Sequence, residues 1–148
     1  MRQDNMSEKK KSDSNLISVL KDDGVPVSEL KKYENCSTVN LEELRKDLGM
    51  GSWAVRIAYN ELFGGVVIQQ QPGEGNRKHY HHDADENWVI LDGTWEWWID
   101  GIGTRTVTTN DIIVVPCGVW HHIKCVGDKP GVRYAITRPD VDHVYEDE

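Results

Sequence analysis

Five of the six histidines lie in two short stretches, and their spacing could support metal chemistry. His79 and His81 are two residues apart, so on a β-strand both imidazoles point to one face. Glu86 follows a turn-like stretch and can bring a carboxylate to the same place. These three side chains form a facial ligand set with open positions for water or substrate. A fourth ligand, the third imidazole, must come from a distant strand, and His121 is the candidate. We predict that these four residues bind one divalent ion, which could be Fe, Mn, Zn or Ni.

The other histidines and two of the cysteines are weaker candidates for a site. His82 and His122 alternate away from the ligand face, so we expect them to point outward or to stand behind the ligands. His143 lies among acidic residues near the C-terminus, where we expect exposure to solvent. Cys117 and Cys125 are interpreted as small buried hydrophobic residues, not as ligands or nucleophiles. The cysteines have no CxxC spacing, so neither a disulfide framework nor a zinc knuckle is indicated.

The elements that must position these residues are mostly strands. From Trp53 onward the apolar residues alternate with a period of two, and Gly-, Pro- and Asn-containing turns separate the segments. The predicted strands are 54–60, 65–71, 87–91, 94–100, 103–109, 111–116, 120–126 and 132–138. Many short strands at near-regular spacing indicate an all-β sandwich or barrel.

Residues 40–49 predict a helix in front of the strands. Asn40 is a suitable N-cap, and Leu41, Leu44 and Leu48 form one apolar stripe. Gly49 follows at the position where helices commonly end. A second, shorter helical candidate covers residues 28–32. The predicted organisation is a disordered tail (1–15), an N-terminal helical segment (16–51), a barrel (52–138) and an acidic, solvated C-terminal tail (139–148).

Four tryptophans fall within eleven residues of the central strands. Trp95 and Trp97 share one strand face with Ile99, whereas Trp98 is on the other face. One interpretation is core packing on one side and a contact with a subunit or the N-terminal segment on the other. The alternative is an aromatic wall beside a ligand cavity, because indole planes suit the C–H faces of sugars. Five polar strand residues could line a cavity, but alternation alone does not show which of them point inward: Arg56, Gln69, Gln71, Arg133 and Arg138.

The first histidine stretch resembles the first signature motif of the cupin superfamily. Gly73 is followed by five residues, His79, one residue, His81, four residues, Glu86, six residues and Gly93. This spacing matches the motif G-x5-H-x-H-x3,4-E-x6-G without a deviation. In cupins, the two motifs form strand pairs of a small antiparallel jelly-roll barrel with the ion inside.

The second stretch resembles the second cupin motif, G-x5-P-x-G-x2-H-x3-N. Asn110 stands at the first glycine position, followed by Pro116, Gly118 and His121, and Cys125 stands at the final asparagine position. Asn110 tolerates the left-handed backbone that a glycine would supply there. The resemblance covers about residues 52–138. It implies an all-β, antiparallel double-stranded β-helix (jelly-roll or cupin barrel) with a short N-terminal helical segment.

Residues 81–96 are also similar to the cupin domain of type II mannose-6-phosphate isomerases. Glu86, Trp88, Gly93 and Thr94 match that pattern, whereas residues 83–85 differ from it. The resemblance favours a small carbohydrate-like or polar carboxylate ligand. Our leading hypothesis is Lewis-acid isomerase or epimerase chemistry on such a substrate. The alternatives are an Fe(II)-dependent dioxygenase and a non-catalytic sugar- or metal-binding module.

Composition limits the partners of this 148-residue chain. Its 17 basic and 25 acidic residues give a formal net charge of −8, which repels polyanions, so we expect no nucleic-acid partner. No apolar run approaches the ~20 residues needed to cross a bilayer, and the polar N-terminus does not resemble a signal peptide. We therefore expect a cytoplasmic protein without a membrane partner. Because the tryptophan strand has large aromatic side chains on both faces, we also expect a homodimer.

Overall fold

Eleven strands and two short helical elements make up the part of the chain that the computed structural model describes, residues 8–12 and 31–146. Their bounds are β1 (Glu8–Ser12), η2 (Lys31–Tyr33, a 3₁₀ helix), α2 (Leu41–Leu48), β2 (Trp53–Tyr59), β3 (Gly64–Gln70), β4 (Gly75–Tyr80), β5 (Glu86–Asp92), β6 (Thr94–Ile99), β7 (Gly103–Thr108), β8 (Ile112–Val115), β9 (His121–Val126), β10 (Gly131–Thr137) and β11 (Asp142–Glu146). No helix in these two ranges is long and apolar enough to span a membrane.

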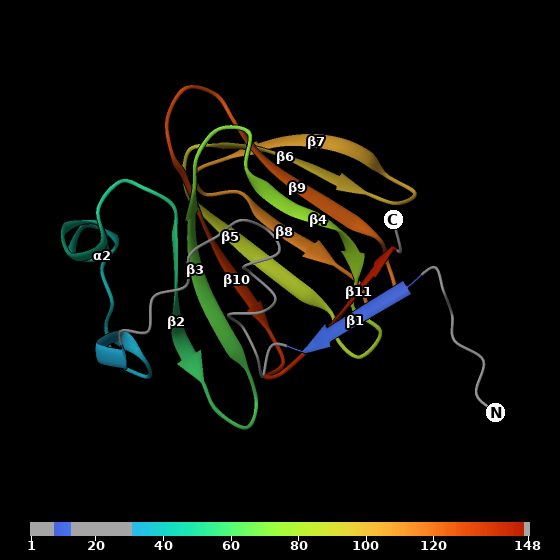
Figure 1. The fold of residues 1–148 in the computed structure, drawn as a ribbon, viewed down its shortest axis with the longest axis horizontal. Helices are drawn as coiled ribbons and strands as arrows, with labels where there is room; N and C mark the ends of the chain where they lie inside the picture. The colour runs from blue at the N-terminus through green and yellow to red at the C-terminus, as the bar shows by residue number, and fades with distance from the viewer. Residues whose placement is uncertain (1–7, 13–30, 147–148) are drawn as a thin grey trace.

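The strands form two antiparallel sheets that pack face to face (Figure 1). One sheet has the order β1-β11-β4-β9-β6-β7 and the other β2-β3-β10-β5-β8. The predicted all-β jelly roll is confirmed, although the hydrogen bonds define two sheets and no closed barrel. Each of the eight strands expected from the alternation corresponds to an observed strand within one or two residues.

The main core lies between the two sheets and is built on the tryptophan strand. Trp95 and Trp97 are fully buried, and Ile99 is 6% exposed, together with Trp88 and Ile90 from β5. The expected core packing of this strand face is therefore confirmed. On the opposite face, the Trp98 ring lies under the Lys78 ammonium, 5.2 Å from the ring centroid.

Helix α2 covers the outer face of β2 and β3, on the side away from the six-stranded sheet (Figure 1). The Asn40 side chain accepts hydrogen bonds from the Glu42 and Glu43 amides, at 2.8 and 3.3 Å, as its N-cap role predicts. The Gly49 amide donates to the Arg45 carbonyl at the C-terminal end. Of the second helical candidate, residues 28–30 lie outside the described residues.

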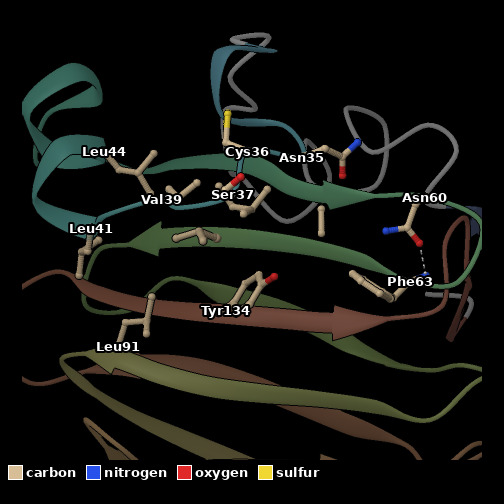
Figure 2. Close-up of a pocket in the computed structure, with 13 residues that line it drawn as sticks. Asn35, Cys36, Ser37, Val39, Leu41, Leu44, Asn60, Phe63, Leu91 and Tyr134 are labelled. Carbon is tan, nitrogen blue, oxygen red and sulfur yellow. Dashed lines mark hydrogen bonds between the residues drawn. The ribbon is translucent and has the colours of Figure 1, made fainter.

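Leu44 anchors α2 to the sheet and is 1% exposed, packed in a cluster with Trp53, Val55 and Val67. Beside this cluster, a cavity of about 530 Å³ lies between residues 35–44 and the sheet. Figure 2 shows Leu41 and Leu44 on one side of it and Tyr134 on the other. This cavity lies on the outer face of the five-stranded sheet.

The two ends of the chain differ from the sequence-based expectation. Residues 142–146, predicted as part of a solvated tail, form β11, which pairs with β4. The apolar residues Val141, Val144 and Tyr145 are buried there, which explains why the acidic residues did not keep this segment in solvent. Residues 8–12, predicted as disordered, form β1 along the outer edge of β11. Residues 1–7 and 13–30 lie outside the described residues.

Candidate metal centre

The four predicted ligands meet at one end of the interface between the sheets. His79 is in β4 and His121 begins β9, and these two residues are direct partners in the strand pairing. His81 follows β4 immediately, and Glu86 is the first residue of β5 in the other sheet. The short connection from β4 to β5 therefore brings the carboxylate to the imidazoles.

These four side chains are buried and close together. The potential ligand atoms of His79, His81, Glu86 and His121 all lie within 4.8 Å of one another. Their residue exposures are 1%, 3%, 7% and 0%, in the same order. The His79 ring centroid lies 4.3 Å from that of His121 and 5.0 Å from that of His81. This is the convergence that the spacing predicted, and such a cluster can bind a metal ion.

The three imidazoles share one anchoring arrangement. His79 Nδ1 lies 2.7 Å from the Arg77 carbonyl oxygen, His81 Nδ1 2.8 Å from that of Asp142, and His121 Nδ1 3.1 Å from that of Val119. A carbonyl can only accept, so each Nδ1 carries a proton and donates it. In a neutral imidazole the lone pair is then on Nε2. Backbone anchoring of the distal nitrogen is how metal-binding histidines are commonly oriented.

The Nε2 atoms face the carboxylate. His81 Nε2 lies 2.6 Å from Glu86 Oε1, and His121 Nε2 lies 3.8 Å from the same oxygen. His121 Nε2 is buried and has no hydrogen-bond partner among the described residues. Because His81 already donates through Nδ1, its Nε2 lone pair would face the negatively charged oxygen of Glu86. A second proton on the ring or a cation between the two atoms must remove this repulsion. The residues present therefore fit a divalent ion, which would satisfy both nitrogens and the carboxylate together.

Burial keeps the donor set in the protonation states that a metal requires. Burial lowers the pKa of His121 to about 4, and it lowers that of His79 well below its ordinary value, with help from neighbouring imidazoles. Burial alone would raise the pKa of Glu86, but His81 and the other nearby imidazoles bring it below its ordinary value. Near neutral pH, His79 and His121 are therefore neutral and Glu86 is charged, as metal ligands must be.

A fourth imidazole, His143, lies beside the cluster. The expectation that it is exposed was wrong: it is 8% exposed, and its ring centroid lies 4.5 Å from that of His81 and 4.8 Å from that of His79. Burial, then His81, lowers its pKa to about 3. His143 is not among the four residues whose ligand atoms converge. The alternation of Val141, His143 and Tyr145 was the sequence signal that could have placed it inside.

The remaining candidates are divided between surface and core. His82 and His122 are both exposed, as their alternation predicted. His82 Nε2 lies 3.0 Å from Asp142 Oδ2 at the rim of the site. Cys125 is fully buried, as predicted, whereas Cys117 is exposed, so that prediction was wrong. Cys117 lies in the turn before β9, and its amide donates to Asp85.

Two motif positions have a clear backbone role. Gly93 has φ +81°, and a Cβ built on it would lie 2.5 Å from Gly131 Cα. A side chain there would meet both a strained backbone and a backbone neighbour. Asn110, at the glycine position of the second motif, has φ +77° and adopts the left-handed conformation that was expected. Gly93 lies in the turn from β5 to β6 and Asn110 in the turn from β7 to β8, and both turns lead the chain from one sheet to the other.

A two-sheet jelly roll with three buried histidines and a glutamate at one end defines a metal-capable β-protein. The family model described as the cupin domain matches residues 66–137, a range that contains all four residues of the cluster. No curated protein sequence matches the chain.

Solved structures with the same fold have low sequence identity to this chain. An uncharacterized conserved protein with a double-stranded β-helix domain from Klebsiella pneumoniae superposes with a TM-score of 0.60 at 16% identity, covering 71% of this chain and 91% of that one. KdgF from Halomonas gives a TM-score of 0.56 at 18% identity, covering 60% and 79%. The oxalate decarboxylase of Lactobacillus farciminis gives 0.52 at 18% identity, covering 58% of this chain and 27% of that one. These similarities concern the fold.

Proposed function

We propose that His79, His81, Glu86 and His121 hold one divalent metal ion at which a small polar, carbohydrate-like substrate reacts. The observation that carries the proposal is the orientation of the imidazoles. All three Nδ1 atoms are held by backbone carbonyls, and the buried Nε2 of His121 has no hydrogen-bond partner among the described residues. A divalent ion there supplies Lewis-acid polarisation of a substrate carbonyl or hydroxyl oxygen.

The chain itself orients the donors and limits the water around them. The carbonyl anchors fix the three rings, and the two sheets keep the cluster at 7% exposure or less. An ion that prefers five or six ligands would retain one or two positions beyond these four. The similarity of residues 81–96 to type II mannose-6-phosphate isomerases supports isomerase or epimerase chemistry over the other reaction classes.

Elemental analysis of the purified full-length protein tests the metal proposal. We expect about one equivalent of a divalent metal in the wild type. His81→Ala and His121→Ala should each fall well below one equivalent, whereas the exposed His82→Ala and His122→Ala should keep it. Full stoichiometric binding in both ligand variants would contradict the assignment.

The identity of the ion divides the reaction classes. Zinc, nickel or manganese with substrate isomerisation would support the leading proposal. Iron accompanied by O2 consumption would support the dioxygenase alternative. Ligand-dependent thermal stabilisation without turnover would support a non-catalytic binding module.

We also propose that the protein is a cytoplasmic homodimer. Trp98 and the exposed residues Ile112 and Val114 leave apolar surface on the outside of both sheets, which supports association. Light scattering at micromolar concentration tests the dimer, and a monodisperse monomer would contradict it. Fractionation of the native host tests the compartment.

A further inference from the structure

A second cavity, of about 20 Å³, reaches one residue of the metal-capable cluster. Glu86 is the member of the cluster that lines it among the described residues, and it is also the most exposed of the four. The larger cavity in Figure 2 contains none of the four residues in its lining and lies on the outer face of the sheet. Of these two cavities, the smaller is therefore the one that reaches Glu86.

Two arginines converge on this cavity from different strands. Arg56 lies in the middle of β2, where the pairing with β3 shifts register between Arg56 and Ala58. Such irregularities re-aim side chains, and the Arg56 guanidinium lies 4.1 Å from the centroid of the Tyr59 ring. Arg138 follows β10, and its side chain is 52% exposed. Both arginines line the cavity together with Glu86.

The charged side chains around the cavity differ in how far their hydrogen-bonding groups are already used. Arg138 Nη1 donates to Asp83 at 3.0 Å, but a guanidinium has five N–H donors in a planar fork. The acidic lining residue Asp140 accepts a hydrogen bond from the Tyr59 hydroxyl at 2.7 Å. Glu86 is engaged by His81 at 2.6 Å. A divalent ion bound at Glu86 would offset the charge of that carboxylate, which lowers the electrostatic cost of bringing an anion beside it.

A volume of about 20 Å³ holds little more than one water-sized group. A group of a ligand that enters this small volume therefore lies close to Arg56 and Arg138, which line it. Guanidinium groups recognise carboxylates and phosphates through paired, charge-assisted hydrogen bonds. Neutral hydroxyl groups gain much less from the same donors.

We propose that Arg56 and Arg138 bind the anionic group, a carboxylate or a phosphate, of a small organic substrate whose other end reaches Glu86 and the metal. This inference deepens the proposed function. Only the contact between the substrate and the metal rests on that proposed function. It makes the two arginines specificity-determining residues for a negatively charged ligand in a chain whose net charge is −8.

Binding of three defined probes to the full-length protein tests this inference. Isothermal titration at constant ionic strength would compare malonate, inorganic phosphate and the neutral polyol erythritol, with metal-loaded and chelated protein. Arg56→Gln and Arg138→Gln each remove one guanidinium, and Arg105→Gln is the matched control, because Arg105 is exposed on β7 away from the cavity. Circular dichroism and metal content would be recorded for every variant.

We expect the wild type to bind malonate or phosphate more tightly than erythritol, and the stronger of the two anions identifies the group. Either cavity variant should lower the affinity for the anion by roughly tenfold or more. The affinity of Arg105→Gln should stay within about twofold of the wild type. Because Arg138 is half exposed, its variant should fold even if Arg56→Gln does not. Anion affinity unchanged in Arg138→Gln, or equal affinity for erythritol, would overturn the inference. Arginine-dependent anion binding in a protein that holds no metal would instead overturn the metal proposal alone.

Discussion

Acidification should destabilise the metal-free protein well above the pH at which its carboxylates titrate. Burial lowers the pKa of His121 to about 4 and that of His143 to about 3, whereas both imidazoles titrate near 6.5 when the chain unfolds. Between these values the unfolded chain binds more protons than the folded protein, so the free energy of unfolding falls as the pH falls. The effect is absent above about pH 7 and grows through the interval from pH 6.5 downward.

The size of the effect follows from the two shifts. At pH 5 each of these histidines should remove roughly 2 kcal/mol from the free energy of unfolding, so together they remove roughly 4 kcal/mol. The lowered pKa of His79 acts in the same direction. The lowered pKa of Glu86 also acts in this direction, but only below its unfolded value of 4.5. A loss of 4 kcal/mol is a large part of the 5–15 kcal/mol typical of a domain.

Urea denaturation of chelated protein at pH 7, 6 and 5 measures this dependence. His143→Asn removes one buried proton-binding group, so its loss between pH 7 and pH 5 should be smaller by roughly 2 kcal/mol, whatever its stability at pH 7. Tyr145→Phe is the control, because it alters a buried ring on the same strand without removing an imidazole. An unfolding free energy that stays constant from pH 7 to pH 5 would refute the reasoning.

Three further predictions concern the frame around the site. Leu44→Ala should lower the free energy of unfolding by roughly 3 kcal/mol in urea, because Leu44 is 1% exposed, yet leave the metal content unchanged. Gly93→Ala should lower the free energy of unfolding by roughly 2–5 kcal/mol, because the position combines φ +81° with a Cβ that would lie 2.5 Å from Gly131 Cα. Wild-type stability of this variant would contradict the prediction. Chelation should lower the melting temperature but keep cooperative unfolding and the β-sheet circular dichroism spectrum, since the core between the sheets is apolar; global unfolding would make the metal structural.

The strands around the site were predictable because their pattern is local. Period-two alternation identifies the strand of Trp95 and Trp97 and the face that it buries, and the structure confirms that face. The helix was equally local, since Asn40 and Gly49 mark its two ends. The convergence of His79, His81 and Glu86 was predictable because only a few residues separate them.

The C-terminal strand was missed because its stability is non-local. Residues 142–146 contain two acidic residues among only five, which indicates a solvated tail when read alone. Their position is determined by pairing with β4, about 65 residues earlier in the chain, and with β1. His143 was misplaced for the same reason. Alternation within one strand also could not show that Arg56 and Arg138 meet, because that depends on the register of β2 and on the turn after β10.

The four cluster residues lower the stability of the fold unless they bind something. Three imidazoles and a carboxylate are buried where apolar side chains would pack at no desolvation cost, and burial of unsatisfied polar atoms lowers stability. His79 and His121 belong to one sheet and Glu86 to the other, so the cluster spans the interface at the end where the smaller cavity opens. A cation at this point would offset the desolvation of all four side chains and link the two sheets. The arrangement is therefore best explained by a ligand-binding role. Because the apolar core between the sheets does not include these four residues, mutations can test ligand binding and folding separately.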